Sequence, residues 1–391
     1  MADLNIFTEG TQKQILDELR LQNSLVKVIA SGWNINDFKT VQELVRGGGG
    51  KRYFPVGTQL SVPHTAYGGD SLLFDVVAHD VYRNPNDPDA HTMTLLMHDV
   101  IYDRMVDNTE AMYAVNADVF PGGMPAGTYN FALLAGYDET YGGGKTYQFT
   151  TTVLIPVGGV IMFPWRDNKQ ASTVLISTYE SCAATTALES NIAVTEGTGG
   201  MFLGTADGTT PHMNHTHRIR YGSNHCGESA IRQWLNSDAV ANAWWKPQTE
   251  FDRAPSYANV AGFLNGIDPD FLAIVGEVDV VTAYNTVYNV NGVKSGTYTT
   301  RDKFFLPSRV EIGYGIENGV SEGSVFDYYD GVANAERIKY DIANPTIARY
   351  WWLRSPIPWN AGIVRIVNPS GEMLNFYATG GQGLAAACVI Y

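Results

Sequence analysis

Charged side chains are scarce in this sequence of 391 residues, of which Asp, Glu, Lys and Arg make up only 17%. Basic residues are the scarcer sign, because 26 Lys and Arg stand against 40 Asp and Glu, which gives a net charge of −14 at pH 7. A chain this acidic is repelled by phosphate backbones and by anionic lipid surfaces. We therefore expect no nucleic-acid partner.

Cysteine and long apolar runs are also lacking. The three cysteines, Cys182, Cys226 and Cys388, are odd in number and form no Cys-x-x-Cys pair, so a disulfide framework is not indicated. Buried free thiols in a protein made in a reducing cytoplasm are the simpler interpretation. No apolar run is long enough to cross a bilayer, and the first residues show no secretory signal peptide. We expect no membrane insertion, and release to the cell exterior by lysis or in a particle.

Glycine and aromatic residues are plentiful by contrast. The chain has 40 Gly, and Phe, Trp and Tyr make up 12% of it, a balance typical of strands and turns. We predict a mainly β protein in three parts. These are a helical segment with a Gly linker (1–50), a small β-sandwich-like domain (51–158) and an α+β C-terminal domain (159–391).

The N-terminal segment predicts a helix between Thr11 and Ser31. Apolar residues recur there at spacings of four and three, and the polar Gln22 completes the row. This is a short heptad pattern, which fits either a helix packed on its own domain or a bundle of helices from several copies. The row comprises Ile15, Leu19, Gln22, Val26 and Ile29.

A second helix is predicted around Val41 to Val45, and four consecutive glycines, Gly47 to Gly50, follow it. Such a run is typical of a flexible joint. From Tyr53 to about Ile155, apolar stretches then alternate with turn residues, as in a β-sandwich. We expect strands within 72–77, 92–97, 129–134 and 147–154. The scattered His79, His91 and His98 are interpreted as hydrogen-bonded strand residues, because they lack a metal-ligand spacing.

The C-terminal segment predicts three strands and a hairpin. Tyr350 to Pro356 contains two adjacent Trp and ends at a proline, which indicates a short buried strand. Asn368-Pro369-Ser370-Gly371 has the residues of a type I turn between two strands. The uncharged 384–391 segment indicates a central strand. Two helices are expected upstream, over 222–234 and 257–264.

This ending resembles the variable proteins of diversity-generating retroelements. The resemblance rests on the Trp-Trp-Leu-Arg-Ser-Pro run from Trp351, the Gly- and Asn-rich hairpin, and the closing Gly-Leu-Ala-Ala-Ala-Cys-Val-Ile from Gly383. Lys303 to Arg309, followed by Glu311 and Gly313, fits the same pattern. The resemblance implies a C-type-lectin-like fold and a ligand-binding protein, probed in many phages as a tropism determinant for host attachment, with a variable region over 350–391.

The resemblance also implies which residues bind. Adenine-directed copying in that family randomises chiefly Asn codons, which cannot become Trp, Met, Gln, Glu or Lys. Trp359, Glu372, Met373 and Gln382 would then be fixed. Trp351, Trp352, Arg354 and Trp359 are expected to form the scaffold of the site. The expected ligand-binding residues are Ile357, Asn360, Gly362, Ile363, Ile366, Asn375, Phe376, Tyr377, Gly380 and Gly381, all on one exposed patch.

Metal binding and catalysis are weighed against this hypothesis. His212, His215 and His217 alternate and could share one zinc ion on a strand, but four ligands or a placed base are not evident. An oxygen-rich loop at Asp268-Pro269-Asp270 leaves calcium open. The resembled fold also houses formylglycine-generating oxidases, which use paired cysteines, whereas Cys388 stands alone. We expect no cofactor, no metal and no enzymatic activity.

Three functions therefore remain in order. The first is a hypervariable receptor-recognition protein of a phage or prophage, displayed on the virion and directed at a host cell-surface protein or glycan. The second is an invariant structural or adhesive virion protein of the same fold, and the third is an oxidase-like enzyme. Because a randomly varied binding face is often weak, we expect several copies to act together in a homo-oligomer, most simply a trimer.

Overall fold

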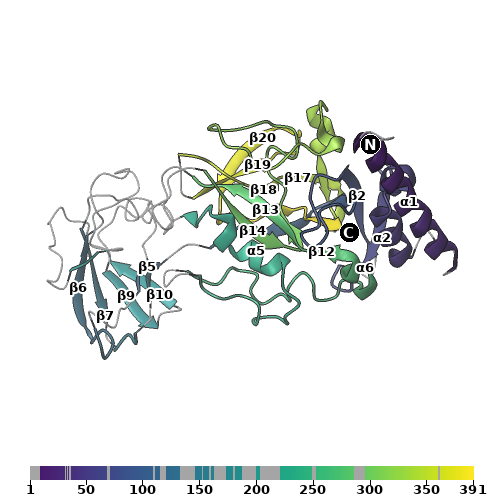
Figure 1. Ribbon diagram of the computed structural model, residues 1–391. Coiled ribbons are helices and arrows are strands. Elements are labelled where there is room, and N and C mark those ends of the chain that lie inside the picture. The colour runs from purple at the N-terminus through teal and green to yellow at the C-terminus, as the bar shows by residue number, and fades with distance from the viewer. Residues whose placement is uncertain are drawn as a thin grey trace, which may run out of the picture.

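The fold is mainly β, as the composition predicts, with two main sheets and a few helices (Figure 1). It is known from a computed structural model. The structure describes residues 9–30, 32, 34, 37–67, 71–108, 111–114, 120–132, 146–151, 153–157, 160–162, 173–178, 181–186, 200–202, 221–248, 252–285, 296–359 and 362–391.

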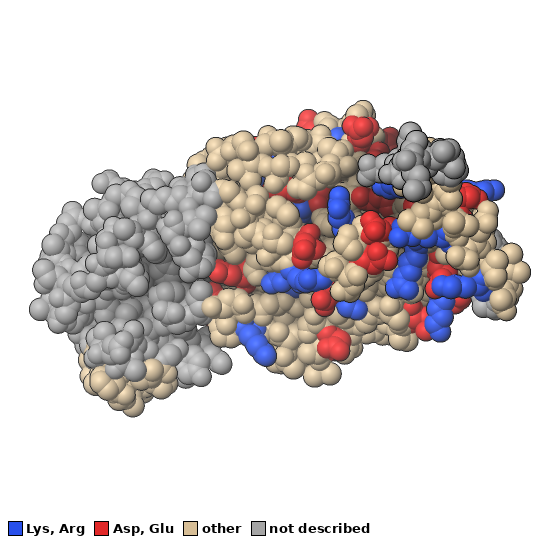
Figure 2. Space-filling model, in the orientation of Figure 1, with Lys and Arg blue, Asp and Glu red and all other residues tan. Residues whose placement is uncertain are grey.

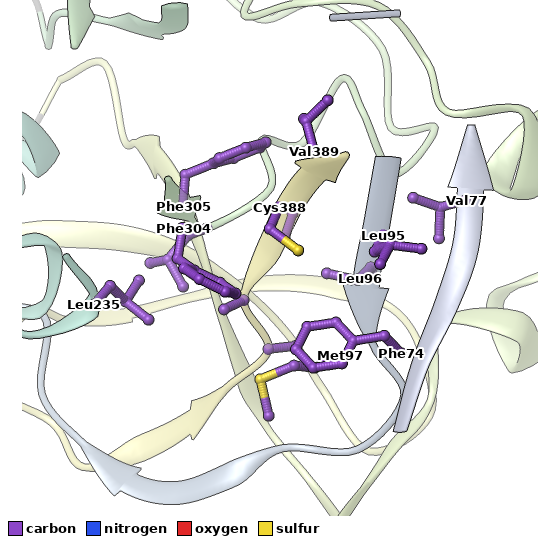
Figure 3. Close-up of a cluster of buried hydrophobic side chains, with 14 of the residues drawn as sticks. Phe74, Val77, Leu95, Leu96, Met97, Leu235, Phe304, Phe305, Cys388 and Val389 are labelled. Carbon is purple, nitrogen blue, oxygen red and sulfur yellow. The ribbon is translucent and has the colours of Figure 1, made fainter. Parts of the chain in front are cut away.

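The first sheet is built around the last strand of the chain, β22. It lies between β3 and β12 and also pairs with β15, so Cys388 has Leu95 on one side and Phe304 on the other. All four residues of β22 are fully buried, which explains its uncharged sequence. Figure 3 shows Phe74, Leu95, Phe304 and Cys388 packed together in this core. The strands are β1 (Gln59–Pro63), β2 (Ser71–His79), β3 (Met93–Met97), β12 (Val275–Gly276), β15 (Phe304–Phe305) and β22 (Ala387–Ile390).

The second sheet carries the C-terminal hairpin. Its order is β20-β19-β18-β21-β4, with the Trp-Trp strand in the middle and β20 at one edge. The predicted strand and hairpin are therefore confirmed. Gly371 N–H donates to Asn368 O at 2.9 Å and closes the predicted turn. The strands are β4 (Ile101–Arg104), β18 (Trp351–Pro356), β19 (Ile363–Val367), β20 (Met373–Tyr377) and β21 (Gln382–Leu384).

The expected separate sandwich over 51–158 is wrong for its first half. The predicted strands at 72–77 and 92–97 exist as β2 and β3, but β3 pairs with β22 along four residues. β4 likewise pairs with β21 near the chain end. These N-terminal strands bury their apolar faces in the C-terminal core, so they and the C-terminal part form one body.

The second half of that range belongs to a separate set of strands. Asn108 and Gly222 lie together in the body, and a Cβ atom on Gly222 would be 2.9 Å from Asn108 O. Residues 109–220 therefore form an insertion that leaves and re-enters the body at one place. Its strands lie to the left in Figure 1. The predicted boundary at Gly158 and Gly159 falls outside the described residues. The strands are β5 (Ala111–Ala114), β6 (Gly127–Ala132), β7 (Thr146–Thr151), β8 (Val160–Met162), β9 (Thr173–Thr178), β10 (Ser181–Thr186) and β11 (Gly200–Phe202). They form a five-stranded sheet, β10-β9-β7-β6-β11, and a pair, β5-β8.

The two predicted N-terminal helices are confirmed, but the flexible Gly joint after them is wrong. Gly47, Gly49 and Gly50 are buried. A methyl group on Gly47 would collide with the Ser24 side chain, and one on Gly50 would lie 3.1 Å from His79 Nδ1. The glycines therefore allow close packing instead of motion. The helices are α1 (Glu9–Ala30), α2 (Phe38–Arg46) and α3 (Gly50–Tyr53).

The later helices are shorter than predicted and begin elsewhere. Ser229 caps one by accepting from Arg232 N–H, so it starts at Ala230 and not at Gly222. Residues 257–264 form turns. Asp268-Pro269 begins the next helix, with Asp268 as N-cap, because proline fits the first helical turn. The remaining elements are η2 (Cys226–Glu228), α5 (Ala230–Leu235), α6 (Pro269–Ile274), β13 (Val278–Ala283), β14 (Thr297–Asp302), η3 (Asp327–Tyr329), η4 (Asn334–Arg337), β16 (Lys339–Asp341) and β17 (Asn344–Arg349).

α1 is the longest of these helices at 22 residues. It and the other helices of the described ranges lack the combination of length and apolarity that crossing a bilayer requires.

Candidate ligand-binding surface

The candidate surface is built on the β19–β20 hairpin. β20 is the edge strand of its sheet and, among described strands, pairs with β19. Side chains alternate between the two faces of a strand, so the register sorts them. Phe376 lies opposite Val364, and Leu374 lies opposite Ile366, on one face. Ile363, Arg365, Met373, Asn375 and Tyr377 lie on the other face.

The first face has a buried floor and an exposed apolar rim. Val364 and Ile366 are each 1% exposed, whereas Leu374 is 43% and Phe376 41% exposed. The ring centroid of Phe376 lies 6.5 Å from that of Trp352, which is fully buried. The two exposed side chains of β20 are therefore supported from below by the core of the sheet.

The opposite face joins the hairpin to the root of the insertion. The rings of Tyr377 and Tyr221 stack with centroids 3.8 Å apart and planes at 11°. Thr379 N–H donates to Tyr221 O at 3.1 Å, and Ser223 N–H donates to Asp107 Oδ2 at 3.2 Å. Residues 109–220 therefore emerge beside the exposed hairpin.

Charge on this second face is neutralised locally. Glu317 accepts hydrogen bonds from the Arg365 guanidinium and forms an ion pair with Arg309, at 2.7 Å between Glu317 Oε2 and Arg309 Nη1. The indole ring of Trp359 is 65% exposed and lies 5.8 Å from the Arg365 guanidinium carbon. Ile316, next to Glu317, is 59% exposed. Exposed apolar groups thus flank an ion-paired cluster on this face too.

The visible face of the molecule carries few charges near the hairpin. In Figure 2 the area over β13, β18, β19 and β20 is almost entirely tan, whereas blue and red side chains mix toward the helical end. An uncharged surface of this kind suits a ligand recognised through shape, apolar contact and hydrogen bonds.

The predicted scaffold holds the hairpin from inside. Trp351 Nε1 donates to Arg337 O at 3.0 Å, and Trp352 Nε1 donates to Arg104 O at 2.7 Å. Arg354 donates twice to Glu311, with both side chains at most 1% exposed. Burial opposes the charge of Arg354, but the Glu311 carboxylate outweighs it and raises the guanidinium pKa. Trp351, Trp352 and Arg354 are therefore confirmed as buried.

Several predicted site residues need correction. Ile357 and Ile366 are 1% exposed and Gly362 is also buried, because side chains from the body cover their face of the sheet. Trp359 is exposed and does not belong to the buried scaffold. The ten residues also lie on both faces of the hairpin, so a single patch is wrong. Asn375 and Phe376 are exposed; Ile363, Tyr377, Gly380 and Gly381 are half-buried; Asn360 lies outside the described residues.

Two residues of the surface were missed from the sequence, Leu374 and Ile316. Leu374 was detectable, because it lies two residues before Phe376 and so shares its face in any strand. Ile316 had no such indication, since it lies in a loop that only the tertiary structure brings beside the hairpin.

The histidines and cysteines supply no reactive centre in the described ranges. His79 Nε2 lies 2.9 Å from Phe54 O, and His98 Nδ1 lies 2.8 Å from Asp75 Oδ2, so these predicted partners are confirmed. Burial raises the pKa of the Cys226 thiol to about 11 and also raises that of Cys388. His, Cys, Asp and Glu side chains of the described residues form no group of three suited to a metal ion. His212, His215 and His217 fall outside those residues.

Asp268 of the proposed calcium loop is used locally instead. Its Oδ1 accepts from Phe271 N–H at 3.0 Å and caps α6. This explains the Asp-Pro pair without an ion.

Comparison with known proteins adds a family but no function. Residues 188–391, just over half of the chain, match the family described as Domain of unknown function (DUF6273). Curated proteins and solved structures gave no match. The matched range includes β18, the β19–β20 hairpin and the central strand β22. The chain therefore belongs to the DUF6273 family.

Proposed function

We propose that this protein binds a ligand through the exposed β19–β20 hairpin, as a receptor-recognition protein with a C-type-lectin-like scaffold. One observation carries the proposal. Leu374 and Phe376 stand more than 40% exposed on an edge strand whose floor, Trp352 and Ile366, is completely packed. Large exposed apolar side chains on a rigid support are typical of binding sites and reduce the entropy lost on association.

The architecture supports a C-type-lectin-like scaffold. The first and last strands of the body meet in one sheet, where β3 pairs with β22, and a second sheet carries the hairpin and its loops. This arrangement leaves loops and an edge strand free to vary while the two sheets share the core. The terminal motifs named above support the same assignment through their resemblance to retroelement variable proteins.

The chemistry of the surface favours a protein or glycan as ligand. Exposed Trp359, Phe376 and Leu374 provide the aromatic and aliphatic anchors that dominate protein interfaces and that stack on sugar rings. The net charge of −14 disfavours a polyanion. We propose a host cell-surface protein or glycan as ligand, with display on a phage particle. We assign no catalytic role, because the pKa of both described thiols is raised by burial.

A matched pair of variants tests the surface. Leu374→Ser/Phe376→Ser/Trp359→Ser should lose binding of the labelled protein to a panel of intact bacterial strains and to an array of purified surface glycans. Val240→Ser/Ile347→Ser, which changes exposed apolar residues elsewhere, should keep every interaction of the natural protein. Retained binding by a correctly folded triple variant would refute the proposal.

An invariant adhesive virion protein of the same fold is the alternative. It shares the surface but not the variation. Sequencing the DNA beside the gene distinguishes the two, because a hypervariable protein requires a template repeat and a reverse transcriptase nearby. Their absence would favour the invariant protein.

A further inference from the structure

α1 presents an apolar row to solvent. Its exposed large side chains are Ile15 (44%), Leu16 (48%), Leu19 (52%), Val26 (65%) and Ile29 (66%). A helix that needed only to pack on its own domain would place such residues inward. These five lie outward, at the end of the body opposite to the insertion (Figure 1).

The helix is held in this orientation by its other face. Ser24 and Val28 are 6% and 1% exposed, and each lies nine residues after a member of the row, Ile15 and Leu19. Nine residues are roughly two and a half turns, so the buried and exposed rows lie on opposite sides. Arg20 Nη1 donates to Asp89 O at 2.9 Å, and Lys27 pairs with Glu43 at 3.1 Å. The body thus fixes α1 with its apolar row outward.

The row has the composition of a coiled-coil seam. From Ile15 to Ile29 the spacings are four, three, four and three, so Leu19 and Val26 take a positions, and Ile15, Gln22 and Ile29 take d positions. No charged residue occupies the seam. The amide of Gln22 both donates and accepts, so identical residues of parallel copies could satisfy one another in a single layer.

The residue types favour more than two strands. Leu at a with Ile at d shifts coiled coils from dimers toward trimers and tetramers. Leu16 and the half-buried Leu25 flank the seam and widen its apolar strip. A row this short would be weak as an isolated helix, but α1 is already folded and oriented on the body, which removes most of the ordering entropy.

We propose that three copies of this chain assemble through a parallel three-helix seam of Ile15, Leu19, Gln22, Val26 and Ile29 of α1. The three bodies then extend outward from the seam. Each carries its own hairpin surface, so multivalent binding follows if that surface binds. The assembly itself does not depend on the proposed function.

Light scattering coupled to size exclusion tests the assembly on the full chain at about 10 μM, a concentration at which avidity in a trimer is relevant. The expected mass is three times the chain mass of 42.8 kDa. Ile15→Ser/Leu19→Ser/Val26→Ser/Ile29→Ser should give a folded protein of single-chain mass. Lys13→Ser/Gln14→Ser/Lys27→Ser, which changes exposed residues of α1 off the seam, should remain trimeric.

Crosslinking tests the parallel register. Gln22→Cys should form an intermolecular disulfide under mild oxidation, because the d layer brings identical positions together, whereas Lys13→Cys should not. The natural chain, whose Cys226 and Cys388 are buried, sets the background. A single-chain or two-chain mass for the natural protein, a trimer that survives the seam changes, or no Gln22→Cys crosslink above background would each overturn the proposal.

Discussion

Arg354 of the Trp-Trp strand and Glu311 form a bidentate ion pair inside the protein, with Nη1 2.6 Å from Oε2 and Nη2 2.7 Å from Oε1. The hydroxyl of Tyr82, next to the start of β3, also donates to Glu311. One buried carboxylate therefore joins three distant parts of the chain. The pair links the second sheet to the loop before η3 and to the N-terminal part of the body.

Breaking this pair should be more damaging than removing it. Arg354→Met leaves the Glu311 carboxylate buried without its partner, and we expect a loss of about 3–5 kcal/mol in the free energy of unfolding. The double variant Arg354→Met/Glu311→Leu should recover a large part of that loss. Urea denaturation of the two single variants and the double variant measures the coupling. Additive losses would show that the two side chains act independently.

The two faces of the hairpin should differ in stability. Ile366→Ala removes a buried side chain and should lower the free energy of unfolding by about 2–5 kcal/mol. Phe376→Ala, at a position 41% exposed, should lower it by no more than about 1 kcal/mol. Thermal denaturation of both variants compares them. Equal losses would mean that Phe376 belongs to the core and cannot act as a free binding residue.

The buried glycines should resist any side chain. Gly47→Ala brings a methyl group onto Ser24 and should destabilise the protein by about 1–3 kcal/mol through overpacking. Gly122→Ala is the control, because nothing lies within 4 Å of a Cβ atom there. The melting temperature of the control should stay close to that of the natural protein. An unchanged Gly47→Ala variant would restore the idea of a flexible joint.

The insertion should be removable. Asn108 and Gly222 are adjacent, and the main core of the described residues takes no side chain from 109–220. Replacing 109–220 by Gly-Ser-Gly should therefore leave a body that unfolds cooperatively near the natural melting temperature. Circular dichroism and calorimetry test this. Loss of cooperative unfolding would mean that the body needs the insertion.

His91 should make stability depend on pH. Its hydrogen bond to Asp80 raises its pKa, burial opposes this, and the charges of Asp80 and Asp17 raise it further. A folded-state pKa above the unfolded value means that the stabilisation is complete below the unfolded pKa of about 6.5 and is lost as pH rises through the folded pKa. Asp17 belongs to α1, so this contact also holds the helix on the body.

A pH series with and without the imidazole tests this dependence. The natural protein should melt above His91→Gln at pH 5.5, and the difference should shrink toward pH 8.5. Comparing the two proteins cancels the other titrating groups, including His98, whose pKa is raised by Asp75. A difference that grows with pH would reverse the assignment.

The sequence alone determined the local elements. Chain-local patterns fix the helix of α1, the strands β2, β3, β18 and β22, and the turn from Asn368 to Gly371, because spacing and turn chemistry act within a few residues. The buried Trp351 and Trp352 were predicted for the same reason: a short apolar strand has little choice but to lie inside.

Only the tertiary structure decided which strands meet and which faces are covered. β3 pairs with β22 across almost the whole chain, and no local pattern encodes that choice of partner. Ile366 and Phe376 both read as apolar strand residues, yet the body covers the first and leaves the second exposed. Gly47 to Gly50 indicate flexibility by composition, but α1 and His79 pack against them. Burial depends on what lies opposite in space, so the candidate surface could be located from the sequence but not resolved into its members.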